Sequence, residues 1–207
     1  MLSFLRSFRR PELYDLGLAS LLVMGVTLAM IFTHRTLREL DLLVVLAVVI
    51  GGLINFLGHE LAHKFMAIRL GAISNFKIVK EGALLTALAI IPFNPIRVIA
   101  PGAVQVSGFL APEQNAKISL VGPLANLFFA SGFLLAAGIL SVFVSDAGVF
   151  VEIMIFLAYF SSYICFFNLL PFGPLDGLEI FRWDRDTYYV LMGITVATWI
   201  TLTLLSR

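Results

Sequence analysis

The stretch LLVVLAVVIGGLINFLGHELAH, Leu42 to His63, joins a long apolar run directly to two histidines and a glutamate. A bilayer core of roughly 30 Å needs about 20 apolar residues in a helix, so this run is long enough to cross it. Burying a polar or ionisable side chain in lipid is costly unless it has a partner. His59, Glu60 and His63 therefore require partners, and they include two of the three histidines in the chain.

The composition places the whole chain among integral membrane proteins. Of its 207 residues, 60% are hydrophobic and 13% are charged, which is more apolar surface than one soluble core of this length hides. The net charge of +1 argues against nucleic acid as a partner, because phosphate binding requires a dense basic face. The single cysteine, Cys165, lies in an apolar run, where we expect it to pack.

Five apolar stretches are long enough to form spanning helices. They cover Leu16–Phe32, Leu42–Gly58, Ile118–Val144, Val149–Leu170 and Thr187–Leu205, and the second continues as a helix through HELAH to about Leu70. Gly71 ends the second stretch, and the Pro/Gly cluster in LPFGPLDG ends the fourth. We predict an all-α polytopic membrane protein that forms a single domain over residues 1–207, with its core over 42–177.

The character of the chain changes between the second and third stretches, over about 72–112. Prolines break any helix there, while FKIVK (76–80) and VQVSGF (104–109) alternate polar and apolar residues as short strands do. We therefore predict a small β element at the membrane surface. The apolar segment Ala83–Ile91 is too short to span the bilayer before Pro92.

The distribution of lysines and arginines predicts a cytoplasmic N-terminus, because short basic loops stay in the cytoplasm. The inner side then collects Arg6, Arg9, Arg10, Lys64, Arg69, Lys77, Lys80, Arg97, Lys117, Arg182 and Arg185, and the outer side keeps Arg35, Arg38, Arg207 and a solvated His34. This orientation places HELAH and Asp176 near the cytoplasmic ends of their helices. The two distant polar motifs are thus expected at one depth.

The HELAH motif has the spacing of a metal site. Residues four apart share one face of a helix, so His59 and His63 can bind one ion, and Glu60 lies within reach of a water on that ion. Catalytic zinc takes three protein ligands and a water, whose pKa it lowers to about 7. Asp176 in PLDG fits best as the third ligand, and Glu179 is the fallback. Aspartate before glycine is also a common turn residue, so spacing alone leaves this open.

Three amides stand near these motifs. Asn168 is a neutral donor that can hold the oxyanion of a tetrahedral intermediate, although an amide at this position can equally pair two helices. We expect Asn55 and Asn126 to pair helices or to orient a ligand, and not to take part in catalysis. Gly122 and Pro123 suit close helix packing and a local bend.

Together, HELAH, GPLAN at 122–126 and NLLPFGPLDG at 168–177 resemble the site-2 protease family of intramembrane zinc metalloproteases. The resemblance covers about 42–177. It implies that one zinc ion is bound by His59, His63 and Asp176, that Glu60 is the general base, and that Asn168 assists the substrate. The chain departs from many relatives at Leu178, where they have a second glycine after DG, and many relatives carry an additional span or a regulatory domain.

The resemblance implies a zinc endopeptidase of the cell membrane that cleaves single-pass membrane proteins within or next to their transmembrane helix. One of the predicted strands, 76–80 or 104–109, can hold the unwound substrate by β-addition. Three alternatives stay open: a metal-ion transporter or binding protein, a silent relative, and a protease of exposed loops that uses Glu179. The presence of Glu60 disfavours a silent relative, because a silent relative has no need of a general base. A transporter needs polar groups across the whole bilayer, whereas the ionisable groups here gather near one side.

Overall fold

The structure is a computed structural model that describes residues 7–32, 41–91, 94 and 97–205. Within these residues, five helices are long and apolar enough to cross a membrane. They are α2 (Arg10–Ile31), α3 (Leu42–Arg69), α5 (Pro112–Phe143), α6 (Gly148–Asn168) and α8 (Arg185–Leu205). The predicted all-α polytopic architecture is confirmed. α2 and α5 begin six residues before their apolar runs, at Arg10 and Pro112, because proline is tolerated in a first helical turn.

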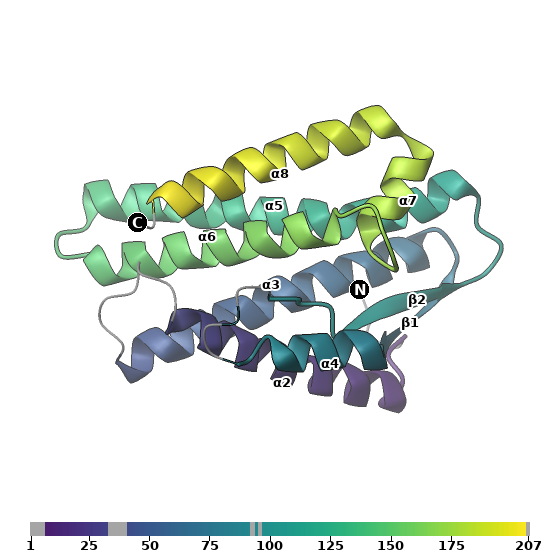
Figure 1. The fold of residues 1–207 in the computed structure, drawn as a ribbon, viewed down its shortest axis with the longest axis horizontal. Coiled ribbons are helices and arrows are strands. Elements are labelled where there is room, and N and C mark those ends of the chain that lie inside the picture. The colour runs from purple at the N-terminus through teal and green to yellow at the C-terminus, as the bar shows by residue number, and fades with distance from the viewer. Residues whose placement is uncertain (1–6, 33–40, 92–93, 95–96, 206–207) are drawn as a thin grey trace.

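The spanning helices run along one long axis, with α2 on one side of the bundle and α5, α6 and α8 on the other (Figure 1). α3 lies between them and packs against α2, α5 and α6. The start of α2, the end of α3, the start of α5 and the end of α6 meet at the same end of the bundle. The short helix α7 (Asp176–Trp183) also lies at this end, so the chain brings HELAH and PLDG to one place.

The predicted β element between the second and third spans is confirmed as an antiparallel pair. β1 (Ile73–Ile78) pairs with β2 (Gly102–Ser107), with Ile73 opposite Ser107 and Ile78 opposite Gly102. The predicted bounds 76–80 and 104–109 were wrong by two or three residues. Lys80 instead begins the helix α4 (Lys80–Leu88), and Gly108 ends β2 with a φ of 144°, which glycine adopts without strain.

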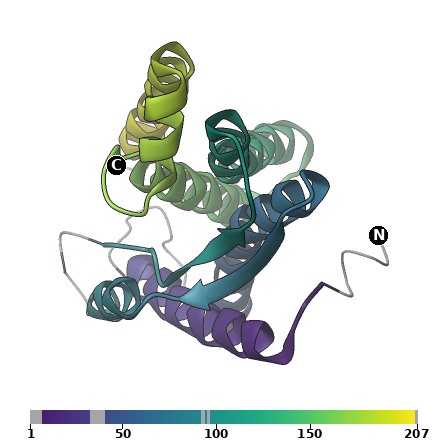
Figure 2. The same cartoon turned by 90° about the vertical axis from the view of Figure 1, so that its right-hand side faces the viewer.

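The sheet and α4 occupy one side of the site end of the bundle (Figure 2). β1 contacts α2 and α3, and β2 contacts α3 and α4. α4 has 9 residues, too few to span a bilayer, as predicted for the segment Ala83–Ile91. The strands therefore lie directly beside the face of α3 that carries the HELAH motif.

Two clusters of buried apolar side chains hold the bundle together. The larger one joins α2, α3, β1 and α6 through residues such as Val23, Val48, Phe76 and Phe156. The smaller one joins α6, α7 and α8 around Cys165. Cys165 is fully buried there, which confirms the prediction that it packs.

The orientation of the bundle stays a prediction. Several of the residues on which it depends, namely Arg6, His34, Arg35, Arg38 and Arg207, lie outside the described residues. Pro92 also lies outside them.

Candidate functional site

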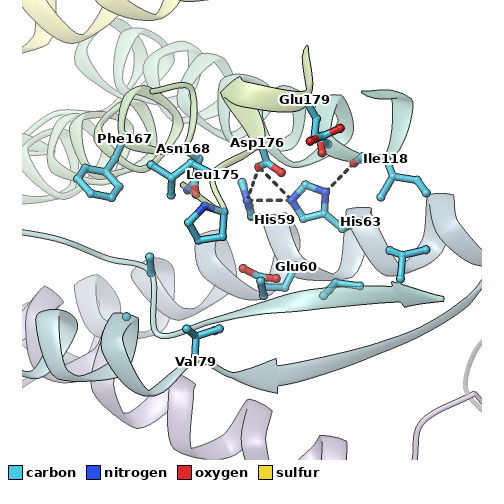
Figure 3. Close-up of a pocket in the computed structure, with 18 of the residues that line it drawn as sticks. His59, Glu60, His63, Val79, Ile118, Phe167, Asn168, Leu175, Asp176 and Glu179 are labelled. Atoms are coloured by element: carbon cyan, nitrogen blue, oxygen red, sulfur yellow. Dashed lines mark hydrogen bonds and ion pairs between the residues drawn. The ribbon is translucent and has the colours of Figure 1, made fainter. Parts of the chain in front are cut away.

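Side chains from α3 and α7 converge on one point (Figure 3). Oδ2 of Asp176 lies 3.3 Å from Nε2 of His59 and 3.2 Å from Nε2 of His63. The two Nε2 atoms are 3.0 Å apart. Both histidines are buried and Asp176 is half-buried. Among the described residues, these three form the group that could hold a metal ion, so the predicted convergence of two distant motifs is present.

The spacing of the three donor atoms fits a tetrahedral zinc site. Zinc lies about 2.0–2.2 Å from imidazole nitrogen and carboxylate oxygen, so neighbouring ligand atoms in a tetrahedron are about 3.4 Å apart. The observed separations of 3.0 to 3.3 Å are close to this value. Two imidazoles and one carboxylate also match the ligand types of catalytic zinc and leave a fourth position for water or substrate.

The outer nitrogens of the two imidazoles decide which atoms face the metal position. Nδ1 of His59 is 2.6 Å from Oδ1 of Asn126, and Nδ1 of His63 is 2.6 Å from the carbonyl oxygen of Ile118. Both partners are acceptors, so each Nδ1 carries the proton and donates. Each Nε2 therefore presents its lone pair toward Asp176, which is the tautomer that metal binding requires.

A buried polar network holds Asn126 in place. Oγ of Ser161 in α6 contacts Oδ1 of Asn55 and lies 2.9 Å from the backbone oxygen of Asn126. All three residues are fully buried. The predicted role of Asn55 and Asn126 in pairing helices is confirmed, and Asn126 contacts His59. Ser161 was missed, although a polar hydroxyl within an apolar helix is a signal for such a contact.

Two glycines allow the close approach that builds the site. A Cβ at position 122 would lie 2.3 Å from Nε2 of His63 and 2.7 Å from Cε1 of His59, so α5 can lie against the imidazoles only with glycine there. A Cβ at position 177 would lie 2.0 Å from the backbone oxygen of Leu169. Gly177 thus lets the first turn of α7 pack on the end of α6, which sets the position of Asp176. The predicted close packing at Gly122 is confirmed.

Glu60 lies between the histidines and β2 (Figure 3). Its side chain is only 7% exposed, and its carboxylate accepts a hydrogen bond from the backbone N–H of Val104. Oε2 has no hydrogen-bond partner although it is buried. A fixed carboxylate with one free oxygen beside a metal-binding group is suited to accept a proton from a bound water. No pattern in the sequence indicates the Val104 contact, because every residue except proline has the same backbone N–H.

A cavity of about 500 Å³ adjoins these residues. Asn168 lines it at the end of α6 but does not contact the three candidate ligands. Its Nδ2 donates to the backbone oxygen of Ile164 at 3.0 Å, which leaves the second amide hydrogen available. Glu179 also lines the cavity, but its side chain is 43% exposed, pairs with Arg182 at 3.4 Å, and is not part of the group that could hold a metal.

The charge state of Asp176 suits a metal ligand. Burial alone would raise the pKa of this carboxyl, but the charge of His63 and the hydrogen bonds of both imidazoles, when the rings are protonated, outweigh burial and lower the pKa to about 2. Asp176 is therefore an anion at neutral pH.

One comparison with known proteins links this geometry to a described protein. The chain is 33% identical over 178 residues to a protein of Methanocaldococcus jannaschii, and the match covers 86% of each chain. That protein carries the name "Putative zinc metalloprotease MJ0611". No family model matches the chain, and no solved structure matches it.

Proposed function

Because this chain belongs to the same family of zinc metalloproteases as the archaeal protein, we propose that it is an intramembrane zinc endopeptidase of the site-2 protease type. Its substrates are single-pass membrane proteins, cleaved within or next to their transmembrane helix. One observation carries the proposal: His59, His63 and Asp176 converge beside Glu60 at a cavity between helices of membrane-spanning length.

Each residue of the site has its own role in peptide hydrolysis. Zinc bound by His59, His63 and Asp176 would polarise the scissile carbonyl and acidify a water. Glu60 takes the proton from the attacking water through its free Oε2, while the N–H of Val104 holds the carboxylate. Glu60 then returns the proton to the leaving amine. Asn168 donates its second amide hydrogen to the substrate oxygen, where negative charge develops.

The substrate backbone must be extended at the cut, because a helix hides its carbonyls in its own hydrogen bonds. β2 is the strand that can pair with it. Ser74 and Phe76 of β1 stand opposite Val106 and Val104, and alternate pairs of an antiparallel ladder direct their N–H and C=O groups outward. The backbone groups of Ser74 and Phe76 already have side-chain partners. Val104 and Val106 line the cavity. The N–H of Val104 already donates to Glu60, so we assign β-addition to the carbonyl oxygen of Val104 and the backbone groups of Val106 on the β2 edge.

The positive-inside distribution of lysine and arginine supports a cytoplasmic N-terminus. The site then opens toward the cytoplasmic side of the cell membrane. Because α7, which begins at Asp176, lies at one end of the bundle, water can reach the site without crossing the bilayer.

The decisive experiment compares variants of the purified protein in detergent with a model single-pass substrate. Glu60→Gln is expected to keep its zinc and to lose turnover by on the order of 10²- to 10⁴-fold, because it removes the proton acceptor only. Asp176→Asn is expected to lose both zinc and turnover, because it weakens the ligand. Glu113→Gln, on the exposed first turn of α5, is the control and should cleave as wild type does. Normal cleavage by Glu60→Gln would overturn the proposal.

A further inference from the structure

A buried ion pair lies immediately beside the HELAH motif. Lys64 follows His63 on α3, and Glu12 lies in the first turn of α2. The two residues are 1% and 3% exposed. Nζ of Lys64 is 2.8 Å from Oε1 and 3.0 Å from Oε2 of Glu12. A buried ion pair adds little net stability compared with apolar residues of the same size. A role for this pair must therefore be sought in its contacts with the rest of the structure.

The same two side chains occupy the outer edge of β1. Oε1 of Glu12 accepts a hydrogen bond from the backbone N–H of Phe76 at 2.9 Å, and Nζ of Lys64 donates to the backbone oxygen of Ser74 at 2.9 Å. Ser74 and Phe76 are two residues apart, so these are the outward-facing groups that a third strand would bind. The carboxylate supplies the acceptor and the ammonium supplies the donor. The pair thus takes the place of a strand on this edge.

The sheet is held from its other edge by the same helix. The backbone N–H of Val104 in β2 donates to Glu60, and Glu60 lies four residues before Lys64. Residues four apart share a helix face, so α3 presents two neighbouring pairs of side chains. His59 and His63 face the candidate metal position, while Glu60 and Lys64 face the sheet.

We infer that Glu12 and Lys64 are positioning residues for cleavage. They close the outer edge of β1 and hold the sheet against α3. The N–H of Val104 then stays on Glu60, and an extended peptide can pair only with the remaining backbone groups of β2. This inference rests on the proposed protease function. It assigns a role to two residues that do not contact the candidate metal position.

The test measures zinc content, turnover and amide exchange in single variants. Lys64→Met keeps the apolar stem and removes the donor, and Glu12→Ala removes the acceptor. Both are expected to keep stoichiometric zinc while kcat falls on the order of a hundredfold, the effect of about 1 Å of misplacement at a catalytic centre. In Glu12→Ala, peptides covering β1 should exchange their amides at least about tenfold faster, because the N–H of Phe76 loses its acceptor. Glu12→Gln keeps an acceptor and should restore most of both properties.

The chain offers a matched control pair. Glu113 and Lys117 on α5 form an ion pair at 2.6 Å whose side chains are about half exposed. Lys117→Met and Glu113→Gln should leave zinc content, kcat and the exchange of β1 unchanged. If removal of one buried charge prevents folding, the double variant Glu12→Gln/Lys64→Met leaves no charge unpaired. It should fold, bind zinc and still show the low kcat.

The outcomes separate this inference from the proposed function. One outcome is that zinc-loaded Lys64→Met and Glu12→Ala differ from the wild type only by a lower unfolding temperature, with kcat unchanged. This result would leave the pair a structural role alone and would overturn the inference. Failure of the wild-type protein to cleave any single-pass substrate would instead overturn the proposed function. Amide exchange in β1 does not require turnover, and unchanged exchange in Glu12→Ala would by itself refute the closing of this edge.

Discussion

Gly122→Ala is expected to displace the imidazoles of the HELAH motif. A Cβ at this position would lie 2.3 Å from Nε2 of His63, whereas ordinary contacts begin at 3.4 Å. Nε2 or the backbone of α5 must therefore move by about 1.1 Å, the difference between these two distances. Nε2 is the atom that faces the candidate metal position, and α5 carries Asn126 and Ile118, the partners of both imidazoles. Either movement disturbs the site.

The expected loss is at least about tenfold in zinc affinity, the effect of a lost partner behind a metal ligand, and on the order of a hundredfold in cleavage rate. Zinc affinity is measured by competition with a chelator, and the rate is measured with a model single-pass substrate in detergent. Gly132→Ala on the same helix is the matched control, because a Cβ there meets nothing within 4 Å. It should keep its activity and gain up to about 1 kcal/mol of helix stability. Wild-type affinity and rate in Gly122→Ala would refute the reasoning.

Three further variants test other parts of the site. Asn126→Leu removes the acceptor of His59 Nδ1 and should weaken zinc binding by about 10- to 100-fold in a chelator competition; undiminished affinity would contradict this role. Gly177→Ala places a Cβ 2.0 Å from the backbone oxygen of Leu169, so it should move Asp176 and reduce the zinc content of the purified protein, and full zinc occupancy would argue otherwise. Asn168→Ala should keep zinc and lower the cleavage rate by about 10²- to 10³-fold; equal rates would remove Asn168 from the mechanism.

The sequence by itself determined the five helices and the pair of histidines in the candidate metal group. Apolar length predicts a spanning helix because a lipid core leaves the backbone no other partners than its own. The four-residue spacing of His59 and His63 places both on one face of any helix. These properties are local, so they can be predicted without knowing how the helices pack. The resemblance to the site-2 protease family then indicated that Asp176 joins them.

Only the tertiary structure decided which groups surround that centre. The alternation of polar and apolar residues predicted two strands, but their bounds differ in the structure. A strand ends where pairing with the adjacent strand stops or where the next helix or turn begins. The partners of the imidazoles and of Glu60 include the backbone groups of Ile118 and Val104, which no side-chain pattern reveals.

The pairing of Glu12 with Lys64 depends in the same way on packing. The two residues are 52 positions apart, and α2 must lie beside α3 and β1 before one carboxylate among many becomes the partner of this lysine. The orientation of Asn168 along its own helix is likewise a product of how α6 ends. A periodic pattern of apolar residues depends on residues that are close in the sequence. A contact between distant residues forms only when the helices pack, because packing decides which of the possible partners lies within reach.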